Sequence, residues 1–513
     1  LNLGLAGRLT SQGSLSGRPD APAVDGRAEA SGLRLPGGIA VEALNARLNL
    51  VASAQGAFDG LLDARGVTVA GRALTRAQAT LAGRRDAHVL ELDARLPDWH
   101  VRAALAGGLD PESVWRGQLR MAEVDGAWPV RLLAPAALVL SRDSQRLESL
   151  TVALAGGRVE VAELQRDGAS FATRGTLADL PLAPFVALVD PPPPATTDLV
   201  VSGDWNLKLG TQLSGEAHLN RVRGDVRLTE PSLALGLTRL ALSLRAVDGQ
   251  AQLQAEIDTR DAGLARFDAR VPVAVEAGVP ALPRTVPLAW TARVNVPDLR
   301  VAKPFLPVGV RVDARLAANL EGGGSLAAPV VNGTLRAEAL RFAMPEEGIS
   351  IEDGILDLVL ADDRVRVRQG EFKGRSGRIV ASGDAEWRNP RAGLTLTFEQ
   401  FAATHRSDRR VTVSGATQLA FVDNRLRLTG NLTVDRARLE MPEASRPTLS
   451  DDVVVAGRSP REPGVARRYP LALDLTLGLG DDFLFKGAGL DARLGGRLRV
   501  YTASVAQQPA AAP

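Results

Sequence analysis

Residues 310–320 read VRVDARLAANL, and this alternating stretch decides the fold class. The even-numbered positions, from Val310 to Leu320, are all apolar, while arginine, aspartate and asparagine occupy most positions between them. Alternation with a period of two places apolar side chains on one face of a β-strand and polar side chains on the other. The stretch therefore predicts a half-buried strand. A helix would repeat its apolar residues every three to four positions.

The same alternation recurs along the chain, and helical spacing is almost absent. Glycine, with 51 residues, often follows serine or aspartate, as hairpin turns require. Strands joined by short turns favour antiparallel pairing, and charges kept to one side leave only one dry face. We predict an all-β chain: a long, mostly antiparallel, repetitive sheet curled into an elongated groove with an apolar interior. Further alternating stretches are 251–258 (AQLQAEID), 364–368 (RVRVR), 394–398 (LTLTF) and 471–479 (LALDLTLGL).

Composition excludes several classes of protein. The 513 residues include no cysteine, which removes disulfide frameworks and thiolate zinc sites. A content of 45% hydrophobic and 23% charged residues is too apolar for a disordered chain. The formal net charge is only +2, and basic residues alternate with acidic ones, so we expect no nucleic-acid partner.

The longest uncharged apolar runs, 132–140 and 180–189, are too short to span a bilayer. We expect any membrane anchor to lie outside this sequence.

A repeated motif indicates a modular organisation. Residues 21–26 (APAVDG) and 328–333 (APVVNG) share a pattern, and each follows a glycine-rich approach. Self-similarity of this kind is typical of stacked repeat units. Residues 180–189 are compatible with a short helix, closed by the proline run 191–194. We predict groove modules at 1–176, 201–295 and 296–400, a helical and proline-rich junction at 177–200, and the start of a distinct C-terminal domain at 401–513.

Residues able to carry catalysis are scarce. The four histidines are isolated from one another, and no phosphate loop, nucleophile elbow or dinucleotide fingerprint occurs. Acidic pairs at 362–363, 451–452 and 481–482 are either carboxylate sites or polar turns between strands, and we favour the turns. We therefore expect no enzymatic activity, no catalytic residues, no metal site and no cofactor.

The apolar face remains as the candidate binding feature. Leucine, valine and alanine dominate it, which suits a smooth apolar surface better than a pocket for one shaped ligand. Two arrangements stay open: a continuous hydrophobic groove, or a series of filled sandwiches. For the groove we predict the lining residues Val310, Val312, Leu316, Leu394, Leu396, Phe398, Leu426, Leu428, Leu432, Val434, Leu471, Leu473, Leu475 and Leu477.

The repeats and an ordered C-terminal series resemble TamB-like proteins of the AsmA superfamily. The series comprises residues 426–442 (LRLTGNLTVDRARLEMP), 449–455 (LSDDVVV), 473–475 (LDL) and 480–496 (GDDFLFKGAGLDARLGG). The resemblance implies a curled β-groove in the periplasm, tethered to the inner membrane by an anchor absent from this chain. It also implies phospholipid movement between the membranes, support for outer-membrane protein assembly, and an outer-membrane TamA-like barrel partner.

Three hypotheses follow. The first is a non-enzymatic conduit whose apolar face shields phospholipid acyl chains. The second is a chaperone-like scaffold that receives outer-membrane protein clients by β-augmentation, without lipid transport. The third is a surface β-solenoid, either an adhesin or a carbohydrate-active enzyme, which the scarcity of Asn, Ser and Thr ladders disfavours.

Overall fold

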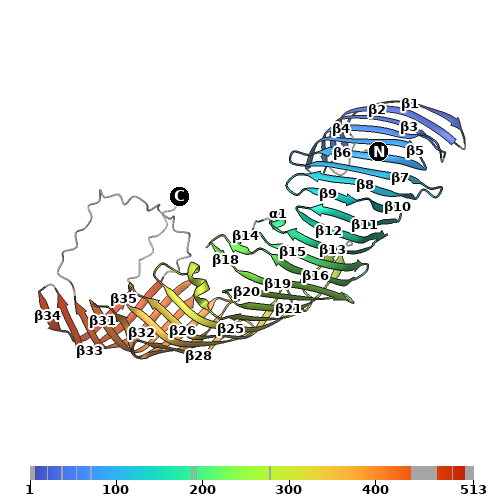
Figure 1. Ribbon diagram of the computed structural model, residues 1–513. Helices are drawn as coiled ribbons and strands as arrows, with labels where there is room; N and C mark the ends of the chain where they lie inside the picture. The colour runs from blue at the N-terminus through green and yellow to red at the C-terminus, as the bar shows by residue number, and fades with distance from the viewer. Residues whose placement is uncertain are drawn as a thin grey trace, which may run out of the picture. The chain divides into compact units, whose positions relative to one another are not determined.

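The computed structural model is built almost entirely of β-strands (Figure 1). Its strands form one long, mostly antiparallel sheet of thirty strands, with two small additional sheets among the described residues. The predicted all-β, curled fold class is confirmed. The structure describes residues 6–19, 21–35, 39–53, 55–69, 72–186, 189, 191, 193–230, 232–276, 279–440, 471–487 and 489–502.

The chain divides into two compact units. The first comprises Leu1–Ile257 with Asp268–Arg284, and the second comprises Asp258–Phe267 with Thr285–Pro513. Strands β20 (Gln250–Thr259) and β21 (Leu264–Pro272) contribute residues to both. These boundaries lie within the predicted module 201–295, and the five-module division stays a prediction.

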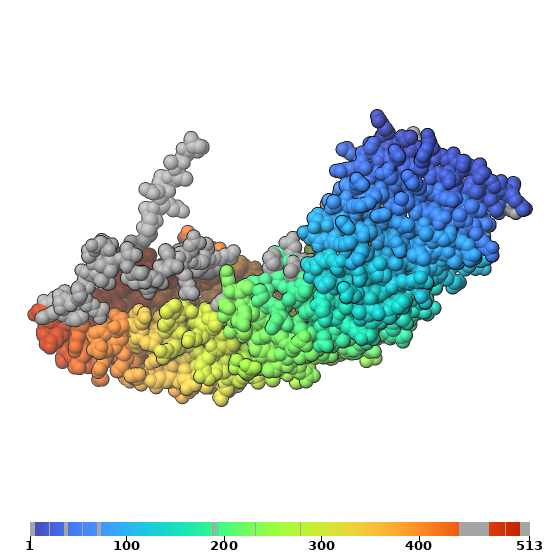
Figure 2. Space-filling view, turned by 45° about the horizontal axis from the view of Figure 1, so that its top comes forward, coloured from blue at the N-terminus to red at the C-terminus, as the bar shows by residue number. Residues whose placement is uncertain are grey.

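In the first unit, antiparallel hairpins follow one another along the sheet. Strands β1 to β8 pair in sequence, β9 and β10 lie together between β8 and β11, and pairing continues through β13, β15, β16 and β19. In the space-filling view the colour passes from blue to green without mixing, because the strands stack in chain order (Figure 2). The strands are β1 (Ala6–Arg18), β2 (Ala21–Leu35), β3 (Ile39–Val51), β4 (Phe58–Val69), β5 (Arg72–Arg84), β6 (Ala87–Arg95), β7 (His100–Leu109), β8 (Trp115–Asp125), β9 (Val130–Ala134), β10 (Ala136–Leu140), β11 (Ser144–Leu154), β12 (Gly157–Asp167), β13 (Ser170–Pro181), β15 (Val200–Leu209), β16 (Leu213–Arg223) and β19 (Leu237–Val247).

Short elements supplement this sheet. A helical turn, α1 (Ala183–Val186), lies within the segment for which a short helix was considered. Strands β14 (Ala195–Thr197), β17 (Val226–Leu228) and β18 (Leu233–Ala234) form a small second sheet, and β22 (Ala274–Glu276) pairs with β23 (Val279–Ala281).

The second unit continues with longer antiparallel strands and one parallel pair. Strand β32 pairs with β33 in parallel from Leu426↔Leu471 to Glu440↔Lys486, whereas β24 to β32 pair antiparallel in sequence. A parallel pair requires a long connection. Here the connection is residues 441–470, which lie outside the described residues. The elements are β24 (Ala289–Val296), the 3₁₀-helix η1 (Leu299–Phe305), β25 (Arg311–Gly324), β26 (Pro329–Met344), β27 (Ile349–Ala361), β28 (Arg364–Gly374), β29 (Arg378–Glu386), β30 (Arg391–His405), β31 (Arg409–Val422), β32 (Arg425–Glu440), β33 (Leu471–Gly487), β34 (Leu490–Arg493) and β35 (Gly496–Tyr501).

The acidic pairs do not all form turns as predicted. Asp362 and Asp363 do lie in the turn between β27 and β28. Asp481 and Asp482 lie inside β33 instead, where Arg436 of β32 places its Nε 2.9 Å from an Asp482 carboxylate oxygen. Cross-strand pairing overrides the low strand propensity of aspartate at this position. The third pair, residues 451–452, lies outside the described residues.

Candidate functional site

The register of the second unit aligns apolar residues in rows that cross ten consecutive strands, β24 to β33. Directly paired residues in a sheet point to the same face, so each row lies on one face. One row contains Val294, Ala318, Leu335, Leu358, Val367, Gly383, Leu394, Leu419, Leu428 and Leu473. The adjacent row contains Ala292, Leu320, Gly333, Leu360, Val365, Ala385, Ala392, Phe421, Leu426 and Leu471.

These two rows, which we call the apolar rows, contain no charged or hydrogen-bonding side chain. The intervening row on the opposite face is mixed and includes Arg293, Arg366, Asp384 and Arg427. The alternation in the sequence therefore gives the sheet two different faces. One face is apolar, and the other carries charged side chains and is hydrated.

Most predicted lining residues lie on the face that carries the apolar rows. Leu396 and Leu475 lie in the next row on this face, beside Leu394 and Leu473. Phe398, Leu432 and Leu477 align one row further along. Their function as lining remains a prediction. On this face lie Leu316, Leu394, Leu396, Phe398, Leu426, Leu428, Leu432, Val434, Leu471, Leu473, Leu475 and Leu477.

Exposure differs along this face. Leu471, at one end of its row, is 47% exposed, whereas Val434 is buried at 4%. Val434 packs with Val413, Ala437 and Phe483 in a closed cluster. Val434 is therefore part of a filled core, while the neighbouring leucines are partly accessible.

The first unit carries equivalent rows, although none of their residues was predicted as lining from the sequence. One row crosses β2 to β8 and reaches β10 through Gly26, Leu48, Gly60, Leu81, Leu90, Leu105, Leu119 and Ala136. On the same face Leu48, Leu62 and Leu92 are each about 40% exposed. Alanine and glycine occupy many aligned positions, which weakens the contrast between apolar and polar positions in the sequence. The signal that remains is strict alternation around each leucine.

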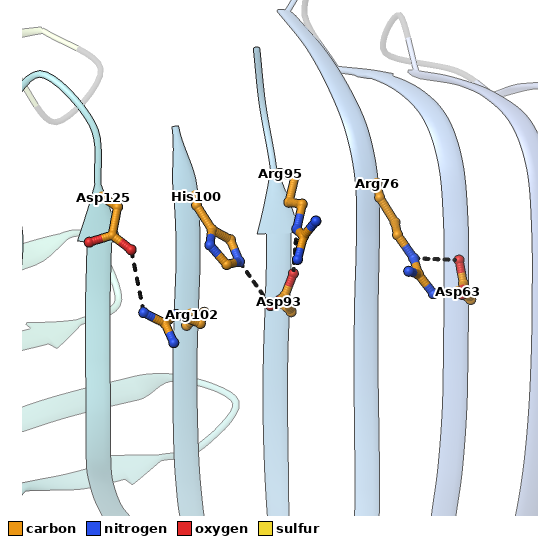
Figure 3. Close-up of polar contacts among 7 residues, drawn as sticks. All are labelled: Asp63, Arg76, Asp93, Arg95, His100, Arg102 and Asp125. Atoms are coloured by element: carbon orange, nitrogen blue, oxygen red, sulfur yellow. Dashed lines mark hydrogen bonds and ion pairs between the residues drawn. The ribbon is translucent and has the colours of Figure 1, made fainter. Parts of the chain in front are cut away.

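Polar and charged side chains contact one another on the opposite face of β4 to β8, and we call these contacts the ladder (Figure 3). Arg76 Nε donates to Asp63 at 3.3 Å, and His100 Nε2 lies 2.9 Å from Asp93. Arg102 continues the ladder to Asp125 at 3.3 Å. The hydrogen bond from Arg76 holds the pKa of Asp63 below its usual range. Exposed pairs of this kind contribute little stability each, so their main effect is to keep this face hydrated.

Two tryptophan rings lie over glycine residues on the apolar face of the first unit. The Trp115 ring lies over Gly107, and its Nε1–H donates to His88 Nε2 at 2.9 Å. In the same way Trp205 lies over Gly175, with its Nε1–H donating to Thr173 Oγ1 at 3.0 Å. The indole donors are therefore satisfied without a charge on the apolar face. His88, an isolated histidine in the sequence, is an acceptor in this arrangement.

A small cover closes part of the apolar face in the first unit. Val201 and Leu199 are 0% and 3% exposed, and they form the best-buried cluster of this region together with Leu237. Val226 of β17 packs on this cluster from the small sheet β14–β17–β18, which we call the cover. The apolar face is thus neither open throughout nor filled throughout.

One carboxylate connects the cover to the start of β19. Asp225 accepts hydrogen bonds from the backbone N–H groups of Val226, Gly236 and Leu237 at 2.8–3.0 Å. Burial alone would raise the pKa of Asp225, but these backbone donors outweigh burial and hold the pKa below its usual range.

A separate hollow in the second unit contains the remaining predicted lining residues. It measures about 540 Å³ and lies between η1 and the ends of β25, β26 and β27. Val310 and Val312 line it together with Phe342 and Ile351. Among the described residues, no group of three or more His, Asp or Glu side chains is arranged to hold a metal ion.

Comparison with known families agrees with this geometry. Residues 1–153 match the family model described as TamB, N-terminal domain, and residues 366–510 match the TamB C-terminal domain. The chain belongs to the TamB family. It is thus a TamB-type, envelope-associated protein, as the resemblance of its repeats and C-terminal series indicated. No solved structure matches the chain significantly. Within the described residues, no helix has the length and apolarity needed to cross a membrane.

Proposed function

We propose that this protein shields phospholipid acyl chains on its apolar face and thereby supports their movement between the inner and outer membranes. The observation that carries the proposal is the pair of apolar rows, which cross ten strands without a charged side chain. An acyl chain on these rows exchanges water for leucine and valine, and each methylene removed from water contributes about 0.8 kcal/mol.

The proposal requires no chemical step, and we assign no catalytic residue. The partly exposed leucines of both units provide contact surface, while the charged opposite face keeps the sheet hydrated. Membership of the TamB family supports a location in the periplasm with an inner-membrane tether. It also supports a partnership with an outer-membrane TamA-like barrel in outer-membrane protein assembly. We assign no residue to contact with that barrel.

A pair of aspartate substitutions tests the proposal. Leu428→Asp places a charge within an apolar row, between Leu419 and Leu473, and Ala416→Asp places the same charge at an exposed position on the opposite face of the neighbouring strand. We expect Leu428→Asp to slow protein-dependent transfer of fluorescent phospholipid between vesicles at least about tenfold, because seating a chain beside a carboxylate costs more than about 1.4 kcal/mol. Ala416→Asp should transfer like the wild type.

The alternative scaffold function predicts a different result. Photo-crosslinkers at Leu428 and Leu475 would then capture unfolded outer-membrane proteins, and vesicle transfer would be equal for both aspartate variants. Lipid adducts at these positions together with slowed transfer by Leu428→Asp support the conduit. Equal transfer by both variants, with each shown to be folded by circular dichroism, contradicts it.

A further inference from the structure

The hollow beside η1 combines an apolar interior with a basic mouth. Val310, Val312, Phe342 and Ile351 supply apolar walls in a volume of about 540 Å³, within the usual range of small-molecule sites. The lining also includes Arg300, Lys303, Arg311 and Arg341, against two acids.

Ion pairing within the described residues leaves two of these cations unneutralised. Arg341 pairs with Asp313, and Arg300 pairs with Asp298. The second lining acid, Glu352, lies 3.8 Å from Arg375.

Lys303 and Arg311 are exposed and have no carboxylate partner in the part of the chain that the structure describes. The site therefore offers two positive charges beside an apolar volume.

The chain between these two cations presents apolar groups to solvent. Phe305 is 54% exposed and Val308 is 93% exposed. Val310 N–H donates to Pro307 O at 3.1 Å, which closes a turn with Val308 inside it. Exposed apolar residues flanked by cations suit contact with an amphiphile, whose apolar and charged parts lie side by side.

We propose that this hollow binds a phospholipid whose head group carries a net negative charge, with one acyl chain in the hollow and the head group against Lys303 and Arg311. The proposal rests on the proposed function and adds to it a preference for anionic over zwitterionic phospholipid. A zwitterionic head group gains less from two unpaired cations, because its own positive charge opposes them.

Lipid retention tests the preference. The purified chain is incubated with vesicles of equal parts phosphatidylglycerol and phosphatidylethanolamine, isolated again, and its retained lipids are quantified by mass spectrometry. Each cation near an anionic lipid is worth about 1 kcal/mol, so the two cations together should give the wild type roughly thirtyfold enrichment of phosphatidylglycerol among its retained lipids. The double variant Lys303→Ala, Arg311→Ala should lose this enrichment and keep most of the total lipid.

Two control proteins isolate the site. Arg410→Ala with Arg438→Ala removes the same charge from two exposed, directly paired positions elsewhere in the second unit, and enrichment should remain. The charge-preserving double variant Lys303→Arg, Arg311→Lys should also retain it. Loss of enrichment only in the Lys303 and Arg311 alanine variant supports the site.

Three results would overturn it: equal enrichment in the wild type and that alanine variant, equal loss in the Arg410 and Arg438 variant, or no enrichment in the wild type. In each of these cases lipid retention itself still supports the conduit. Absence of retained lipid from every protein contradicts the conduit and this site together.

Discussion

At the scale of single residues, the repeated APxV(D/N)G motif places glycine in two different environments. Gly333 has φ +138°, and a Cβ there would lie 2.2 Å from the Asn319 carbonyl oxygen. Gly26, its counterpart in the first repeat, does not have φ in this positive range. A Cβ added to Gly26 would meet only the Gln12 carbonyl oxygen, at 3.7 Å. The motif therefore demands glycine for backbone reasons in one copy only.

Gly333→Ala should destabilise the second unit by about 1–3 kcal/mol, because alanine at this φ is strained and its methyl group collides with the paired strand. Urea unfolding followed by circular dichroism measures the change. Gly26→Ala is the matched control and should shift the free energy of unfolding by less than about 0.5 kcal/mol. Equal effects of the two substitutions would contradict the conclusion that only Gly333 requires glycine for its backbone conformation.

The sequence located most apolar residues of the site but not their environment. Alternation alone places Leu428 and Val434 on the same face of a strand, and the structure agrees. It does not reveal that Val434 is 4% exposed in a closed cluster, because burial depends on Phe483, which is distant in the sequence. The contact between Trp115 and His88 is equally non-local, since 27 residues separate them.

At the scale of elements, alternation predicted the strands well and their order less completely. Antiparallel hairpins follow from short glycine turns, which keep successive strands adjacent. The parallel pairing of β32 with β33 does not follow, because it depends on the path of residues 441–470 rather than on the pattern of either strand. The sequence also did not predict the cover. Its strands β14, β17 and β18 have three residues or fewer, which is too short for a pattern of alternation to be recognised.

Acidification should loosen the cover. The pKa of Asp225 is lowered in the folded protein, so its stabilising effect is complete above the ordinary aspartate pKa of 3.8 and is lost as the pH falls through the lower folded-state value. Asp225→Asn removes the charge at any pH. We expect it to lower the free energy of opening the cover by about 1–2 kcal/mol, measured by hydrogen exchange of the Val226 and Leu237 amides near neutral pH.

Asp143→Asn provides the control for this substitution. Asp143 lies in an exposed turn of the same unit, and its substitution should leave the exchange of the cover unchanged. Unaltered protection in the Asp225 variant would show that packing of Val226 on Val201 holds the cover without the carboxylate.

At the scale of the whole molecule, the sequence left two arrangements open, and the structure contains elements of both. Leu48, Leu62 and Leu92 are about 40% exposed on an open apolar face, while Leu199 and Val201 are closed under the cover. Sequence periodicity determines which side of a strand is apolar. It does not determine whether that side faces solvent or another layer, because the covering segment can come from any part of the chain.

The central claim is that acyl chains contact the apolar face and not the opposite face. The absence of cysteine allows one fluorophore-labelled cysteine to be introduced at a chosen position. Leu92→Cys and Leu428→Cys report on the apolar face, and Glu91→Cys and Arg427→Cys report on the opposite face of the same strands. Phospholipids brominated on their acyl chains should quench the fluorescence of the first pair strongly and leave the second pair bright. Equal quenching at all four positions, or quenching at Glu91 and Arg427 alone, would contradict the account.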